Sequence, residues 1–382
     1  MRITFLLSRF LNGGIDTVIV RYLQYLANQN YDLQLIVATE YKGLQPFESE
    51  IPSNVEVKYL LSESILTSLA KKKLSSNLNP AEKVVDAIFL SPIRRFLTQI
   101  RLHKYLKTTD VVIDFDSRSY SFLKSEKCKK IAFFHFSINK YHGGNDRKLA
   151  RLCSKMANYD NIVLICNKMA EEFIQRAPQL KSKISVIYNP IDEQQIKRKA
   201  LEYNVPDVDY ILSVGRLAEQ QKDFTTLIKA YAKTWRINHN IPPLYIIGDG
   251  RNRKDLEALA KNENVAEQVK FLGYLTNPMP WIAKAKLFIL SSKFEGLPTV
   301  LIEALMLNRV IIATDCPTGP AEILDYGKCG FLVPIGDDKS LSKAIIDALF
   351  DESSRDSLLS NVLEHQKVFT PEVIIPQLIE LF

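Results

Sequence analysis

The chain has 382 residues, of which 46% are hydrophobic and 24% charged, and this length predicts two domains of about 150–200 residues each. Its five cysteines form no Cys-x-x-Cys pair and no cluster with histidine, which argues against a zinc site, a disulfide framework and an oxidising compartment. The net charge is +7, and no apolar run is long enough for a signal peptide or a membrane span, so we expect a cytoplasmic protein, at most peripheral on the inner face of the membrane.

Short apolar runs rich in β-formers occur throughout the first half of the chain. They are RITFLL, LQLIVA, VEVKYL, DVVIDF, KKIAFFHF, NIVLIC and KISVIY. Helical patterns lie between most of them, for example over residues 14–28 and 168–177. A polar stretch over residues 193–209 is then typical of a helical turn and a linker.

The same rhythm restarts after this linker. Its apolar runs are DYILSVG, PLYIIG, QVKFLG, KLFILS, RVIIATD and GFLVP. Runs without alternation are typical of strands buried on both faces, so the sequence predicts an α/β protein with two parallel sheets. The predicted domains are residues 1–190 and 205–365, with residues 366–382 packing back on the first. Because parallel sheets bind ligands at the carboxyl ends of their strands, we expect a site in a cleft between the domains.

A basic segment lies in a long insertion between the third and fourth predicted strands. Residues 71–107 carry nine Lys or Arg against Glu82 and Asp86, a surplus that equals the net charge of the chain. Ile93, Phe96, Leu97 and Ile100 share one helical face, and Arg94 and Arg101 share another. Such a helix can lie on an anionic membrane surface, or it can simply cover the first sheet.

The segment FEGLPTVLIEA (residues 294–304) places two glutamates eight residues apart, at a turn and inside a helix. Pro298 fits the first helical position, so the free amides of this helix start form an anion site. A diphosphate there would leave sugar hydroxyls for Glu295 and ribose hydroxyls for Glu303. A surface glutamate and an ordinary helical glutamate are the alternative interpretation.

Cations follow the first strand of the second domain. Arg216 and Lys222, in SVGRLAEQQKDF, are placed to neutralise a diphosphate and the charge that grows on a leaving group. GDGRNR (residues 248–253) lacks the last glycine of the dinucleotide fingerprint, so a nicotinamide cofactor is not supported. In FLNGGID, Gly13 and Gly14 would let the backbone approach a bound phosphate or sugar.

These motifs together resemble glycosyltransferase family 4. The resemblance rests on VGRL with a lysine six residues after its arginine, on the E-x7-E of FEGLPTVLIEA, and on CPTGPAEIL and GFLVPIGD; it is strong over residues 209–337 and weaker over 1–192. It implies the GT-B fold, in which two Rossmann-like domains with parallel sheets face a central cleft. It also implies a retaining transferase that uses a nucleotide sugar and needs no metal or cofactor.

The resemblance implies a role for individual residues. The second domain would hold the donor and the first the acceptor. Arg216, Lys222, Thr299, Val300 and, from the first domain, Gly14 would bind the donor diphosphate. Glu295, Gly296 and Leu297 would bind the donor sugar, Glu303 the ribose, and Tyr274 and Leu275 the base. His135 and Glu295 would be the catalytic residues, and the leaving phosphate itself would take the proton of the acceptor.

The sequence DFD (residues 114–116) has the Asp-x-Asp form of a metal site in the other large glycosyltransferase fold. Helical sequence follows, so we expect Asp116 to be an N-cap and predict no metal.

The expected activity is transfer of a hexose or N-acetylhexosamine from a nucleotide sugar to a glycan or lipid-linked acceptor in cell-surface polysaccharide biosynthesis. A UDP-linked donor is expected and a GDP-linked one stays open. Two alternatives are a nucleotide-sugar epimerase on the same fold and a non-catalytic protein that binds nucleic acid or anionic lipid. Few aromatic residues interleave with the basic ones, so no nucleic-acid partner is expected.

Overall fold

The computed structural model describes residues 1–11, 13–44, 47–75, 78–139 and 145–382. The described chain divides into two compact units. Unit 1 comprises residues 1–165, 170–190 and 375–382, and unit 2 comprises residues 166–169 and 191–374. The fold is α/β, as the apolar runs predict.

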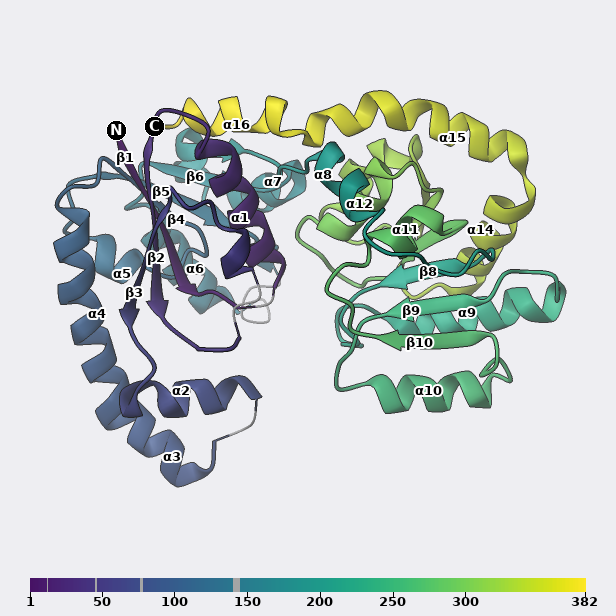
Figure 1. Cartoon of the computed structure of the whole chain (residues 1–382), viewed down its shortest axis with the longest axis horizontal. Coiled ribbons are helices and arrows are strands. Elements are labelled where there is room, and N and C mark those ends of the chain that lie inside the picture. Colours follow the sequence, from purple (N-terminus) through teal and green to yellow (C-terminus); the bar gives the residue numbers. More distant parts are fainter. Residues whose placement is uncertain (12, 45–46, 76–77, 140–144) are drawn as a thin grey trace. The chain divides into compact units, whose positions relative to one another are not determined.

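In its described residues, unit 1 is built on a seven-stranded parallel sheet with the order β3-β2-β1-β4-β5-β6-β7 (Figure 1). All of the predicted strands of the first half are present. They are β1 Arg2–Arg9, β2 Asp32–Thr39, β3 Glu56–Leu61, β4 Val111–Asp114, β5 Lys129–Phe134, β6 Asn161–Leu164 and β7 Ile184–Val186. Buried aliphatic and aromatic side chains fill both faces of the central strands, which is why these runs show no alternation.

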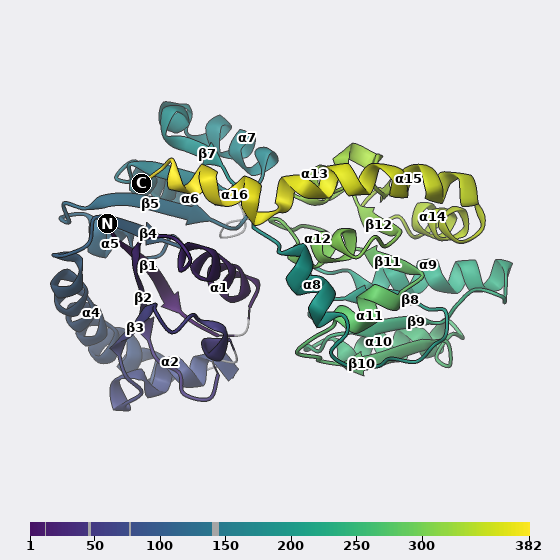
Figure 2. The same ribbon diagram turned by 45° about the horizontal axis from the view of Figure 1, so that its top comes forward.

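Helices connect the strands of unit 1. They are α1 Gly14–Leu26, α2 Ile65–Ser75, α3 Pro80–Val85, α4 Ser91–Leu106, α5 Tyr120–Leu123, α6 Asp146–Met156 and α7 Asn167–Arg176, with short 3-10 helices at Glu48–Glu50 and Pro178–Lys183. A π-helical turn, Asp86–Leu90, joins α3 to α4 without a break. In Figures 1 and 2, α2 lies beside the α3 end of this long helix.

In its described residues, unit 2 contains a six-stranded parallel sheet with the order β10-β9-β8-β11-β12-β13. The strands are β8 Ile211–Val214, β9 Leu244–Ile247, β10 Val269–Gly273, β11 Leu287–Leu290, β12 Ile311–Thr314 and β13 Phe331–Val333. The helices are α8 Glu193–Lys199, α9 Phe224–Ile237, α10 Arg253–Asn262, α11 Met279–Lys284, α12 Thr299–Met306, α13 Pro320–Ile323, α14 Asp338–Phe350, α15 Glu352–His365 and α16 Pro371–Ile379, with short turns at Asp325–Gly327 and Gln366–Phe369. Helix α16 contains the boundary to the last segment of unit 1.

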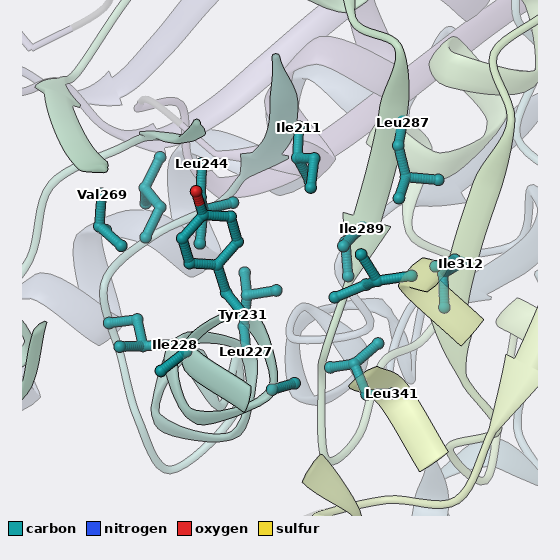
Figure 3. Packing of buried hydrophobic residues seen from close by; sticks show 14 of the residues in the cluster. Ile211, Leu227, Ile228, Tyr231, Leu244, Val269, Leu287, Ile289, Ile312 and Leu341 are labelled. Carbon is teal, nitrogen blue, oxygen red and sulfur yellow. The ribbon is translucent and has the colours of Figure 1, made fainter. Parts of the chain in front are cut away.

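The core of unit 2 lies between its sheet and helices α9 and α14. Figure 3 shows Leu227, Ile228 and Tyr231 of α9 beside strand residues such as Ile211 and Leu244. Spacings of one, three and four residues place these helical side chains on one face, and their burial against the sheet stabilises the unit.

Both sheets reverse their strand order at one point, between β1 and β4 in unit 1 and between β8 and β11 in unit 2. Loops that leave the carboxyl ends of such neighbouring strands diverge to opposite sides and leave a crevice. The fold therefore provides one candidate ligand position in each unit.

Candidate functional site

The loops after β8 and β11 carry the motifs that the sequence singled out in unit 2. Residues 215–223 connect β8 to α9, and residues 291–298 connect β11 to α12. Since β8 and β11 are neighbours at the reversal point, their loops meet, and the backbone amide of Lys293 donates to the carbonyl of Gln221 at 2.7 Å.

Polar side chains hold the β8–α9 loop in place. The carboxylate of Glu219 accepts hydrogen bonds from the amides of Phe224 and Thr225, at 2.9 and 3.1 Å, and so caps α9. Asp223 has a positive φ of 51° and is buried, where its carboxylate pairs with Lys293 Nζ at 3.2 Å. These contacts link both loops and fix the positions of the side chains between them.

Two glycines of GDGRNR pack directly against the same loop. A Cβ atom on Gly248, whose φ is +140°, would lie 2.0 Å from the carbonyl oxygen of Gly215. One on Gly250 would lie 2.5 Å from the carbonyl oxygen of Leu217. The segment therefore needs glycine for close backbone approach, which is a structural reason independent of any dinucleotide fingerprint.

Lys222 and Glu295 form a buried ion pair at the centre of the site. Lys222 Nζ lies 2.6 Å from Glu295 Oε1, and the two side chains are 15% and 7% exposed. Glu295 also accepts from Ser292 Oγ at 2.5 Å and from Gln221 Nε2 at 3.3 Å. Three donors thus converge on one carboxylate and set its orientation.

A cavity of about 460 Å³ lies against the β8–α9 loop, and it is linked to this pair through Gln221, which lines the cavity and contacts Glu295. Its lining residues are Arg216, Leu217, Ala218, Gln220, Gln221, Gly250, Arg251 and Phe294. Arg216 Nη2 lies 3.5 Å from Gln221 Oε1, so Gln221 lies between Arg216 and Glu295. Two guanidinium groups and an aromatic ring give the cavity the character of a pocket for an anionic, partly planar ligand.

The turn that carries Glu295 is held by the segment CPTGPAEIL. Thr318 Oγ1 donates to the carbonyl of Glu295. Gly319 has a φ of +90°, and a Cβ atom there would lie 2.5 Å from the carbonyl oxygen of Gly296. These contacts press the two segments together and fix Glu295, Gly296 and Leu297 in one conformation.

Helix α12 begins one residue later than the sequence predicts. Pro298 is the N-cap rather than the first helical residue, with extended backbone angles, and Thr299 is the first residue of the helix. The expectation for Pro298 is wrong by one position because its ψ of 103° lies outside the helical region. Thr299 and Val300 lie in the first turn as expected, and Glu303 is buried one turn further on.

Tyr274 and Leu275 lie in the loop after β10, the edge strand of the sheet. Tyr274 is exposed. Neither residue is among those that line the cavity. Their base-binding role stays a prediction.

In unit 1, Gly14 and His135 lie at the carboxyl ends of strands, as expected from the sequence. Gly14 is the first residue of α1, and a Cβ atom there would meet nothing within 4 Å. The Asp16 carboxylate accepts from the amide of Gly13 at 2.9 Å, and its burial raises its pKa to about 6. The first turn of α1 is therefore closed by a carboxylate that is hard to ionise.

His135 follows β5 and is buried against Phe115 and Phe133. This burial lowers the pKa of His135 to about 4, so the imidazole is neutral at pH 7, and one hydrogen bond joins it to the backbone of Phe115. Its Nε2 atom is buried without a hydrogen-bond partner among the described residues. A buried ring nitrogen without a partner is suited to form a hydrogen bond with a hydroxyl of a ligand.

Asp116 does not cap a helix, which corrects the expectation from sequence. Helix α5 starts at Tyr120, and the Asp116 carboxylate instead accepts from the amide and hydroxyl of Ser8, on β1. Asp114 accepts from the amide of Ser119 at 2.8 Å and from the hydroxyl of Tyr159. Burial first, and the neighbouring carboxylate second, raise the pKa of Asp114. Within the described part of the chain, no three His, Cys, Asp or Glu side chains gather as metal ligands.

Sequence reasoning missed several residues that shape the site in unit 2. Ser292 and Gln221 orient Glu295, and Arg251 and Phe294 line the cavity. Arg251 lies in GDGRNR and Phe294 in FEGLP, so their position after a strand was the available signal. Ser292 and Gln221 also follow strands, but their role in orienting Glu295 depends on how the two loops meet, which the sequence does not show.

Comparisons with known protein families cover nearly the whole described chain. Residues 193–364 match the family described as Glycosyl transferases group 1, and residues 12–195 match Glycosyltransferase Family 4.

Individual relatives agree with these families. An N-acetylgalactosamine-N,N'-diacetylbacillosaminyl-diphospho-undecaprenol 4-alpha-N-acetylgalactosaminyltransferase of Campylobacter jejuni is 33% identical over 94% of this chain and 93% of its own. A lipopolysaccharide 1,6-galactosyltransferase of Salmonella typhimurium is 30% identical over 65% of this chain and 68% of its own.

Among solved structures, Anabaena Alr3699/HepE in complex with UDP has a TM-score of 0.76 at 16% identity and covers 100% of this chain and 99% of its own. TarM has a TM-score of 0.77 at 12% identity, with coverage of 100% and 98%. At these identities the likeness shows the fold alone, which is GT-B. With both halves matched and a full-length relative at 33% identity, the chain belongs to glycosyltransferase family 4.

Proposed function

We propose that this protein is a retaining glycosyltransferase that moves a hexose or N-acetylhexosamine from a UDP-sugar to a glycan or lipid-linked acceptor in cell-surface polysaccharide biosynthesis. The observation that carries the proposal is the cavity linked through Gln221 to the Lys222–Glu295 pair, with Arg216 in its wall. The named activities of the Campylobacter and Salmonella relatives and the UDP bound to Anabaena Alr3699/HepE support the donor and acceptor classes.

In this proposal the donor diphosphate binds Arg216 and the amides of Thr299 and Val300, at the start of α12. Lys222 is paired with Glu295 in the structure, and a diphosphate gives it a second anionic partner. Charge grows on the leaving diphosphate as the sugar departs, so cations fixed in advance stabilise the transition state more than the bound substrate.

The carboxylate of Glu295 and the amides of Gly296 and Leu297 would hold the donor sugar. Ser292 and Gln221 keep the Glu295 carboxylate in place even when Lys222 moves toward the diphosphate. Glu303 would bind the ribose, and Tyr274 and Leu275 the base. The nucleotide would then extend from the start of α12 toward the loop after β10.

Residues of unit 1 would complete the reaction. The backbone of Gly14 would contact the diphosphate, and Nε2 of the neutral His135 would form a hydrogen bond with a sugar hydroxyl. The acceptor oxygen bonds to the anomeric carbon as the bond from that carbon to the diphosphate oxygen breaks. The acceptor proton goes to the leaving phosphate, on the same face, which leaves UDP and a glycoside with retained configuration.

Thermal stabilisation by nucleotides tests the donor site. The panel contains UDP, GDP and their hexose and N-acetylhexosamine conjugates, and a ligand at 100 times its Kd adds about 2.7 kcal/mol. We expect UDP and one UDP-sugar to stabilise the protein, and Arg216→Ala to abolish the shift. Lys343→Ala, an exposed lysine on α14, is the matched control that should keep it. If no nucleotide stabilises the wild type, the proposal is wrong.

A second measurement separates transfer from other chemistry. With the stabilising UDP-sugar, UDP release should require an acceptor, and the product should keep the anomeric configuration of the donor by NMR. A change in the sugar without an acceptor would instead indicate an epimerase.

A further inference from the structure

The long helix formed by α3, the π-helical turn and α4 carries a row of apolar side chains that points away from unit 1. The row consists of Val85, Phe89, Ile93, Phe96 and Ile100, which follow one another at spacings of three and four residues. Each is between 42% and 66% exposed. Val84 and Ile88 are exposed beside it. Five large apolar residues on one outward face are more than the scattered singles of an ordinary surface.

The inner face of the same helix binds the rest of unit 1. Thr98, Leu102 and Leu106 are buried. Arg94 donates to the carbonyl of Leu66 in α2 at 2.6 Å, and Arg101 donates to the carbonyl of Leu60 in β3. These arginines hold the helix to the protein, while its apolar face is exposed. The exposed row therefore has no packing role within the described part of unit 1.

Basic groups lie at both ends of the row. Lys83 lies two residues before Val85, and Lys104 and Lys107 extend the line of the row beyond Ile100. All three lysines are exposed and form no ion pair with any described residue. Both acidic residues of the segment are neutralised, Glu82 by Lys72 at 2.5 Å and Asp86 by Arg94 at 2.7 Å. The surface is thus apolar at its centre and positive at its two ends.

We propose that this row is a membrane-docking surface that inserts its apolar side chains into the interface of a bilayer containing anionic lipid. An apolar centre with basic ends matches the boundary between acyl chains and negative headgroups. No helix in the described residues is long and apolar enough to cross a membrane, so the contact is peripheral.

Other occupants fit the charges less well. A second copy would bring two surfaces of the same positive sign together, which costs free energy at the ends. A nucleic acid would satisfy the lysines and leave the apolar row against a charged backbone. The inference goes beyond the proposed function, and it stands or falls without any donor or acceptor.

Co-sedimentation of the whole chain with vesicles tests the proposal. The vesicles contain phosphatidylcholine alone or phosphatidylcholine with phosphatidylglycerol. We expect binding to the anionic vesicles, weakened at least about tenfold by the double substitution Phe89→Ser/Phe96→Ser. Phe350→Ser, a phenylalanine of α14 that is 53% exposed, is the matched control and should leave binding unchanged.

Charge is tested separately. Lys104→Gln/Lys107→Gln should weaken binding to anionic vesicles by roughly fivefold for each lysine. Added salt should weaken binding of the wild type in the same way, because it screens the attraction between lysines and anionic lipid. Lys261→Gln/Lys270→Gln, on unit 2, is the control for lost charge and should bind as wild type. Phe96→Trp should also show fluorescence quenching by brominated lipid, which reports insertion without removing the row.

Three outcomes would overturn the proposal. Wild-type protein that binds neither kind of vesicle excludes a membrane partner. Unchanged binding by Phe89→Ser/Phe96→Ser, with no quenching of Phe96→Trp, shows that charge alone acts. A dimer in solution that the same double substitution separates, with no vesicle binding, identifies a second copy as the occupant.

Discussion

Removing the lysine of the buried ion pair should destabilise unit 2 measurably. In Lys222→Met the Glu295 carboxylate, 7% exposed, loses the donor that lies 2.6 Å away. Loss of one partner of a buried pair costs about 3–5 kcal/mol, and Ser292 and Gln221 still donate, so we expect about 2–3 kcal/mol. For a unit of this size that corresponds to a fall in melting temperature of about 5–10 °C.

The double substitution Lys222→Met/Glu295→Gln should recover most of this loss, because no uncompensated charge stays buried. Both tryptophans, Trp235 and Trp281, lie in unit 2, so urea unfolding followed by tryptophan fluorescence reports this unit. We expect the double variant within about 1 kcal/mol of wild type. If the two single effects simply add in the double variant, the pair is not coupled and the reasoning fails.

Three further changes have outcomes that the structure sets. Burial raises the pKa of Asp16 to about 6, so the contribution of its carboxyl group to stability is present below pH 3.8 and lost as pH rises through 6. The free energy of unfolding of Asp16→Asn should therefore rise by about 1.5–3 kcal/mol relative to wild type between pH 4 and pH 8, as measured by urea titration followed by circular dichroism. Burial lowers the pKa of His135 to about 4, so the free energy of unfolding of wild type falls as pH falls from 6.5 toward 4. His135→Gln should lose about 3 kcal/mol less than wild type over this pH range, and an unchanged pH profile would contradict the burial argument. Gly248→Ala, with its Cβ 2.0 Å from the Gly215 carbonyl, should cost about 3 kcal/mol or more in tryptophan-monitored unfolding, whereas Gly336→Ala, which meets nothing within 4 Å, should cost only about 1 kcal/mol.

The strands could be predicted from sequence because a strand buried on both faces has an uninterrupted apolar run. A run such as LQLIVA or KLFILS has no polar alternation, and each proved to contain a parallel strand. The exact start of a helix was harder to predict from the residues of the preceding turn. Pro298 was placed one residue too far into its helix, since proline is compatible both with the N-cap and with the first helical turn.

The candidate site could be predicted where one short segment carries several functional residues. Glu295, Thr299 and Glu303 lie within nine residues, so their spacing alone relates them to one helix start. Asp116 shows the opposite case, because its partner Ser8 is 108 residues away in the sequence and no local pattern predicts the contact. The sequence left open whether the apolar face of α4 covers the sheet or faces outward, because arginine can donate to backbone carbonyls as readily as it can face water.

The discontinuity of unit 1 has a consequence for how the protein is made. Residues 375–382 belong to unit 1, where the ring of Phe382 lies 5.7 Å from that of Tyr31 and Lys129 Nζ donates to the Phe382 backbone oxygen. A ribosome that adds about 5–20 residues per second reaches this segment only after it has synthesised all of unit 2. The first unit to emerge is therefore the last to be completed, and it must avoid aggregation during that interval.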